Sequence, residues 1–210
     1  IAESVAAVSA ADTNALVDEY YDKYQINLEG RDPEEFNKHV AVQAQIELGF
    51  ERFLEEKNYQ AIVTHFGDLG ALQQLPGLAI QRLMEKGYGF GAEGDWKVAA
   101  MVRLMKVMTN GMKDAKGTSM LEDYTYNLVK GKEGIIQAHM LEICPSISEG
   151  PIEIKCQPLS MGNREDPARL VFQSKEGKGV ATSLGSMIAV NPIMALSCFG
   201  IFLIISSLAD

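Results

Sequence analysis

The chain has 210 residues, of which 47% are hydrophobic and 22% are charged. This composition is typical of a folded globular protein rather than a disordered one, and the length suffices for one large or two small domains. The net charge of −9 argues against a nucleic-acid or anionic-membrane surface, because both need clustered Lys and Arg. The three cysteines, Cys144, Cys156 and Cys198, lack CxxC spacing. We therefore expect reduced thiols in the cytoplasm, and no disulfide framework or zinc site.

The first half of the chain alternates helix and strand patterns. The opening residues have no basic segment, so no secretory signal is expected, and the missing initial Met predicts a fragment. Asp32-Pro33-Glu34-Glu35 combines a cap, a proline at the first helical position and acids in the first turn. The elements expected here are helices at 13–24, 33–57, 77–86 and 95–112, and strands at 59–65 and 88–90.

The β-branched run at 59–65 indicates a central strand of a parallel sheet. Ligands meet such sheets at the carboxyl ends of the strands, which brings His65 and Phe66 to the edge of a candidate site. A plain strand-to-helix turn explains the same residues equally well. The pattern alone leaves both interpretations open.

A polar, glycine-bearing connector at 110–117 separates this half from a strand-rich half. Short apolar runs separated by turn residues are typical of antiparallel hairpins. The strands expected are 120–129, 134–143, 152–158, 168–173 and 179–183. We therefore divide the chain into an α/β domain at 1–113, a β-rich domain at 114–185 and a tail at 186–210.

The tail is strongly apolar, and residues 186–209 carry no charged side chain. Its length could span a bilayer, which needs about 20 apolar residues. Pro192 and Gly200 are tolerable in such a span, but no basic flank sets an orientation. We favour an altered reading frame over a membrane anchor, and either kind of tail should promote aggregation or membrane contact.

Three separated residues form a candidate metal set. Glu93 follows a glycine-rich approach at the start of an expected helix, Glu122 lies in an expected strand, and His139 lies in the next strand. Carboxylate oxygens suit Mg²⁺ and Mn²⁺, and an imidazole shifts the preference towards Mn²⁺, Co²⁺ or Zn²⁺. Spacing alone is weak evidence, because an acidic chain also places such residues by chance. In the alternative, Glu122 and His139 are solvent-facing strand residues.

Longer sequence motifs surround these residues. They are Leu69, Gln74-Leu75-Pro76-Gly77-Leu78-Ala79, Gly87-Tyr88-Gly89-Phe90-Gly91-Ala92-Glu93-Gly94-Asp95-Trp96-Lys97, Glu122-Asp123-Tyr124-Thr125-Tyr126, His139-Met140-Leu141-Glu142-Ile143-Cys144-Pro145-Ser146 and Asp166-Pro167-Ala168-Arg169-Leu170. In these motifs the chain resembles the L-arabinose isomerase family, and the resemblance runs from about Ala11 to about Leu184. The family continues with mixed β-strands beyond this point, so the resemblance ends before the apolar tail.

The resemblance implies a fucose/arabinose isomerase-like fold: a Rossmann-like parallel sheet with flanking helices, then an antiparallel, β-rich partial barrel. It implies conversion of L-arabinose to L-ribulose through an ene-diolate, with D-galactose to D-tagatose as a secondary reaction. Glu93, Glu122 and His139 match ligands of Mn²⁺, and the two glutamates also match the acid/base pair. Phe66 matches a residue that lines the sugar pocket.

The resemblance also implies a cytoplasmic homohexamer. It further implies a fourth metal ligand, a histidine in the distal part of the family's C-terminal domain, which has no counterpart in this sequence. Without that histidine and without the N-terminal domain, the sugar pocket is incomplete, and an incomplete pocket can neither orient a sugar nor exclude water. The alternative to an isomerase fragment is a non-catalytic remnant that folds or associates but turns nothing over. The preferred sugar stays open.

Overall fold

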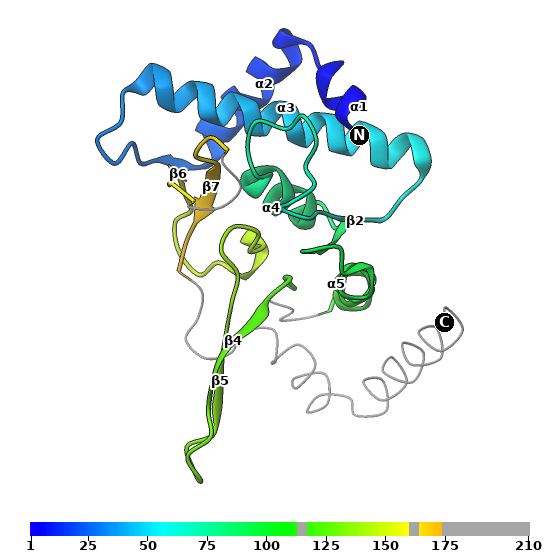
Figure 1. The fold of residues 1–210 in the computed structure, drawn as a ribbon, viewed down its shortest axis with the longest axis vertical. Helices are drawn as coiled ribbons and strands as arrows, with labels where there is room; N and C mark the ends of the chain where they lie inside the picture. The colour runs from blue at the N-terminus through cyan, green and yellow to red at the C-terminus, as the bar shows by residue number, and fades with distance from the viewer. Residues whose placement is uncertain (113–116, 160–163, 174–210) are drawn as a thin grey trace.

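The computed structural model describes residues 1–112, 117–159 and 164–173 of the chain (Figure 1). The elements are α1 (Ala2–Ala6), α2 (Ala10–Lys23), β1 (Gln25–Ile26), α3 (Pro33–Lys57), β2 (Ala61–Val63), α4 (Gly77–Glu85), β3 (Gly89–Gly91), α5 (Trp96–Thr109), β4 (Glu122–Asn127), β5 (Gly134–Ala138), the 3-10 helix η1 (Pro145–Ile147), β6 (Glu153–Cys156) and β7 (Ala168–Val171). Helices thus dominate the first part and strands the second, as the sequence pattern predicts.

The described strands form three small sheets. β2 and β3 pair in parallel, β4 and β5 pair antiparallel, and β6 lies between β1 and β7. β6 is parallel to β1 and antiparallel to β7. The mixed α/β class is therefore confirmed, and β4 and β5 pair across the expected turn. The Rossmann-like sheet and the partial barrel stay predictions.

Local signals account for the helix ends. The Asp32 carboxylate accepts hydrogen bonds from the backbone N–H groups of Glu34 and Glu35, and α3 begins at the residue after Asp32, as expected. α3 ends at Lys57, and its C-cap residue Asn58 adopts the left-handed conformation with φ of 55°. α2 begins earlier than the sequence predicts, because Ser9 caps it by accepting from the Asp12 N–H at 3.1 Å.

The core joins segments that are far apart in the sequence. Ile154 of β6 and Leu170 of β7 pack in one apolar cluster with Leu16 of α2, Phe36 of α3 and Leu78 of α4. The two C-terminal strands therefore help to cover the helices of the first half (Figure 1). The domain division near residue 114 stays a prediction, and residues 113–116 lie outside the described ranges.

A buried ion cluster fastens α4 to α2 and α3. The Arg82 side chain is 5% exposed, and its Nε lies 3.3 Å from the carboxylate of Glu47, which is 0% exposed. Tyr20 donates its hydroxyl to the same carboxylate at 2.6 Å, and the Lys86 ammonium lies 2.8 Å from it. Burial, followed by the Glu47 charge, raises the pKa of Tyr20 well above its ordinary value. Every member of the cluster thus has a partner of complementary charge or hydrogen-bonding type.

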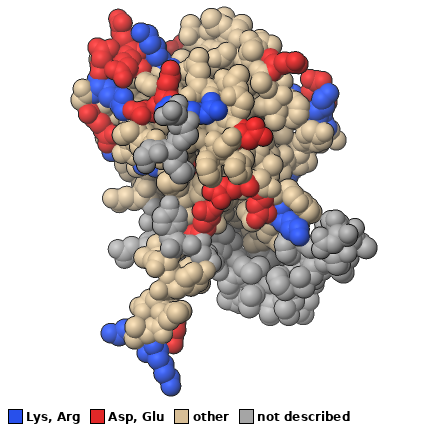
Figure 2. Space-filling model, in the orientation of Figure 1, with Lys and Arg blue, Asp and Glu red and all other residues tan. Residues whose placement is uncertain are grey.

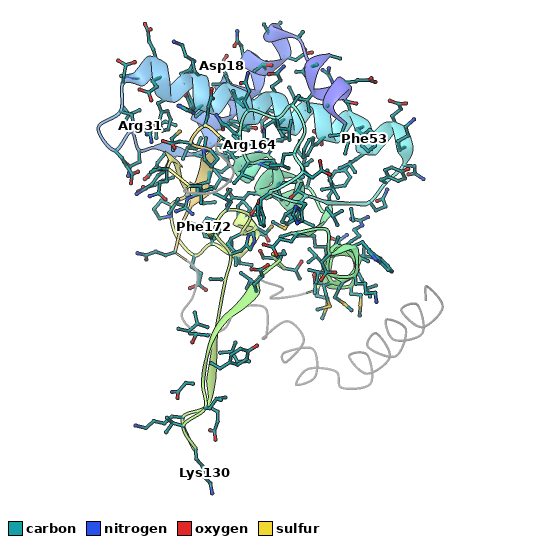
Figure 3. All side chains as sticks on the ribbon, viewed as in Figure 1. Asp18, Arg31, Phe53, Lys130, Arg164 and Phe172 are labelled. Carbon is teal, nitrogen blue, oxygen red and sulfur yellow. The ribbon has the colours of Figure 1, made fainter. Side chains whose placement is uncertain are left out.

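The β4–β5 hairpin projects from the body of the molecule, with Lys130 at its tip (Figures 1 and 3). Several of its apolar side chains are exposed, among them Ile135, Ile136 and Leu128, which is 82% exposed. Within the described ranges, no helix combines the length and the apolar character needed to cross a bilayer. The expected strand at 179–183 and the tail at 186–210 lie outside these ranges.

Candidate functional site

Glu93 lies in the turn that joins β3 to α5, at the carboxyl end of the parallel β2–β3 pair. Its φ of 56° is in the left-handed region, and Gly94 follows with φ of 83°. The Gly94 N–H donates to the Thr64 carbonyl at 3.0 Å, which ties this turn to the end of β2. The Glu93 side chain is exposed just before the α5 N-terminus, where a negative charge is favoured.

Two glycines of β3 allow α5 to pack directly against the strand. A Cβ atom on Gly91 would lie 2.0 Å from the Asp95 carbonyl oxygen, and one on Gly89 would lie 2.1 Å from the Ala99 carbonyl oxygen. Both distances are far below van der Waals contact. These two glycines of β3 therefore determine where α5 begins, and with it the position of the Glu93 turn.

Phe66 lies in the loop after β2, at the same edge of the parallel pair. Its ring stacks on His65, with 4.9 Å between the ring centroids, and it remains partly exposed. His65 Nδ1 accepts a hydrogen bond from the Gly67 N–H at 3.1 Å. The loop thus presents an aromatic face to solvent beside the Glu93 turn.

Glu122 and His139 are brought together by the hairpin. Glu122 pairs with Ala138 in the antiparallel register, so His139 follows at the base of the hairpin. Glu122 Oε1 lies 3.9 Å from His139 Nε2. On the opposite side of the ring, Glu142 Oε2 lies 2.8 Å from Nδ1, although the N–H does not point straight at that oxygen.

The charges around His139 favour its protonated form. Burial of the ring lowers its pKa, but the carboxylates of Glu142, then Glu122 and Glu93, outweigh burial and raise the pKa above its ordinary value. Acidic side chains gather where the hairpin leaves the body (Figure 2). Glu93 therefore acts on the ring electrostatically, although it forms no ion pair with it at contact distance.

We expect protonated His139 to stabilise the protein at low pH. Because its pKa is raised above the ordinary 6.5, this contribution is fully present below that value and is lost as the pH rises through the folded pKa. Urea unfolding across this window should show the stability advantage of wild type over His139→Gln shrinking with rising pH. An advantage that does not change with pH would contradict this charge balance.

The structure brings together two of the three expected metal ligands. Glu122 and His139 face each other, and the donor types fit a divalent cation such as Mn²⁺. Within the described part of the chain, no three His, Cys, Asp or Glu side chains are arranged so that they could hold a metal ion, so Glu93 does not complete a site with this pair. Two donors of the expected set thus fit a shared cation, and a third would have to move towards them.

Sequence reasoning missed Glu142. A strand over 134–143 would turn residues 139 and 142 to opposite faces, because side chains alternate along a strand. β5 instead ends at Ala138, and the chain bends so that both side chains meet. The motif around His139 contained this residue, but nothing in the pattern indicated that the strand would end so early.

Comparisons with known proteins match most of the chain. A family model of the L-arabinose isomerase central domain matches residues 1–111, and one of the L-arabinose isomerase C-terminal domain matches residues 117–192. The L-arabinose isomerase of Geobacillus thermodenitrificans is 51% identical over 184 residues, which cover 88% of this chain and 36% of the relative. That of Geobacillus stearothermophilus is 53% identical over 177 residues, covering 84% of this chain and 35% of the relative. That of Clavibacter sepedonicus is 49% identical over 187 residues, covering 89% and 37%. The chain thus spans little more than a third of the length of these relatives.

Proposed function

The chain belongs to the L-arabinose isomerase family, and on this premise we propose that it is part of a metal-dependent aldose–ketose isomerase that converts L-arabinose to L-ribulose. The observation that carries the proposal is the pairing of Glu122 with His139 at 3.9 Å, together with Glu93 at the carboxyl end of a parallel strand pair. The relatives carry the name of this activity. The combination of oxygen and imidazole donors supports the metal part of the proposal.

The reaction moves a proton between adjacent sugar carbons through an ene-diolate. We propose that Glu93 and Glu122 form the acid/base pair, because each carries a carboxylate that is at least partly open to solvent. Glu93, Glu122 and His139 would hold Mn²⁺. The bound metal would stabilise the negative charge that develops on the sugar oxygens.

Phe66 would pack its ring against the C–H face of the sugar. Its exposed position in the loop beside the Glu93 turn supports this role. D-galactose, which has one carbon more than L-arabinose, would be a secondary substrate and would yield D-tagatose. A pocket wall made of one aromatic ring discriminates weakly against one extra carbon.

The wider architecture is part of the same proposal. We propose a Rossmann-like sheet and a partial barrel that the whole protein completes, in a cytoplasmic homohexamer. Exposed apolar side chains on the β4–β5 hairpin support burial against further protein. Among the described cysteines, Cys144 and Cys156 are free and buried, and burial raises the pKa of Cys156 to about 12. The raised pKa makes the Cys156 thiol unreactive at neutral pH.

The second candidate is a non-catalytic remnant that folds or associates but turns nothing over. One observation favours it: no three potential ligands within the described residues are arranged so that they could hold a metal ion. Under this hypothesis Glu122 and His139 form an ion pair at the base of the hairpin and bind no metal.

Titration of the chain with Mn²⁺ separates the two candidates. We expect Glu122→Gln to weaken Mn²⁺ binding by more than about tenfold, because it removes a ligand. Glu133→Gln, which removes an exposed carboxylate near the tip of the same hairpin, should leave the affinity unchanged. A ketose assay with L-arabinose on the same samples then tests turnover. Equal affinity in both variants, or no binding by wild type, would favour the remnant.

A further inference from the structure

Glu142 is a buried carboxylate that the proposed reaction does not use. Its side chain is 8% exposed, and a charge at such a site needs a partner. Within the described residues, its ion pair is with His139, at 2.8 Å between Oε2 and Nδ1. The carboxylate therefore faces the ring nitrogen that points away from Glu122.

The segment that carries Glu142 is fixed from several directions. The carbonyl of Met140 accepts a hydrogen bond from Arg169, and that of Ile143 accepts one from the buried Gln81 at 2.9 Å. The Cys144 N–H donates to Ser119 Oγ at 2.8 Å. These bonds anchor the backbone on both sides of Glu142, so the carboxylate is held beside the ring before any ligand arrives.

The two ring nitrogens of a neutral histidine have different roles, because one carries the proton and the other a lone pair. A carboxylate at Nδ1 favours the tautomer protonated there, and the lone pair is then on Nε2. Nε2 is the atom that faces Glu122. The contact with Glu142 thus favours a proton on Nδ1, and the lone pair on Nε2 faces Glu122, where a cation could bind.

We propose that Glu142 is a positioning residue that holds the imidazole of His139 with its proton on Nδ1, so that Nε2 is presented towards Glu122 as a metal ligand. This inference rests on the proposed function, because it requires His139 to bind the metal. Glu142 itself touches neither metal nor sugar in this assignment. Its effect is exerted through the ring.

The test uses the whole chain and two readouts. Nitrogen-15 NMR of the metal-free protein, at a pH where the ring is neutral, reports the tautomer of His139. The chain has three histidines, so His139→Gln identifies the signal. Mn²⁺ titration of the same samples reports the affinity. Glu142→Gln keeps the size of the side chain and removes its charge, Glu142→Asp keeps the charge, and Glu133→Gln is the control.

We expect wild type and Glu133→Gln to carry the proton on Nδ1, and Glu142→Gln to shift the ring towards the other tautomer. Mn²⁺ affinity should fall about 10–100-fold in Glu142→Gln and recover in part in Glu142→Asp. An unchanged tautomer in Glu142→Gln would overturn the inference whatever the affinity does. Absence of Mn²⁺ binding by wild type would instead contradict the proposed function, and the tautomer readout would still decide the role of Glu142 at the ring.

Discussion

Replacing Arg82 with Met is expected to destabilise the protein by about 3–5 kcal/mol, because it leaves a buried carboxylate without its guanidinium. Glu47 is fully buried, and Arg82 contacts it, donates to Tyr24 and reaches Glu19 at 2.5 Å. Lys86 remains beside Glu47 in the variant, but it replaces neither the bond to Glu19 nor the packing of the guanidinium over the Tyr20 ring. Urea unfolding measures the loss directly.

The matched control is Arg52→Met. Arg52 forms an ion pair with Asp12 at 2.7 Å, but the two side chains are 46% and 50% exposed. An exposed pair of this kind contributes only about 0–1 kcal/mol. The double variant Glu47→Gln, Arg82→Met should recover part of the loss, because it also removes the buried charge that has lost its guanidinium. Similar losses for Arg82→Met and Arg52→Met would refute the argument from burial.

Gly91→Ala is expected to cost at least about 3 kcal/mol, at the upper end of what overpacking causes. The added Cβ would lie 2.0 Å from the Asp95 carbonyl oxygen, and that atom belongs to the backbone that begins α5. A flexible side chain could move aside, but here the helix itself has to shift. Because the Glu93 turn connects β3 to α5, the variant should also weaken Mn²⁺ binding if Glu93 is a ligand.

Gly134→Ala is the control for this substitution. Gly134 begins β5, has no positive φ, and its added Cβ would meet no atom within 4 Å. Its stability should therefore change by no more than about 0.5 kcal/mol. Thermal unfolding of both variants would reveal the difference, and equal midpoints would contradict the close approach of α5 to β3.

Local chemistry explains which parts of the fold the sequence could predict. α3 begins after Asp32 as expected, because its cap, its proline and its acidic first turn lie within four consecutive residues. The pairing of β4 with β5 followed from two short runs separated by turn residues, and it is confirmed. The pairing of β6 with β7 was not predicted, because no short turn joins the two strands. β1 was not predicted, because its two residues form a strand only when β6 pairs with them. No pattern within Gln25–Ile26 indicates a partner so distant in the sequence.

Some features of the candidate site could likewise be predicted from the sequence, and others could not. Glu122 and His139 were grouped from the sequence by residue type and by resemblance, and the hairpin brings the two together at its base. The early end of β5 could not be predicted, since it depends on Leu141 turning into the core and on Arg169 of β7 binding the Met140 carbonyl. The roles of Glu93, Glu122, His139 and Phe66 stay predictions, which the Mn²⁺ titrations address.

The pairing of β1 with β6 also governs how the chain folds during synthesis. Asn27 and Glu153, which are joined by a hydrogen bond beside this pairing, are separated by 126 positions. At about 5–20 residues per second, the ribosome needs about 6–25 s to make the intervening chain. During that interval the apolar faces of α2 and α3 lack the strands that cover them. These apolar faces therefore stay uncovered for many seconds in the nascent protein, and this part of the core is completed only after β7 has been made.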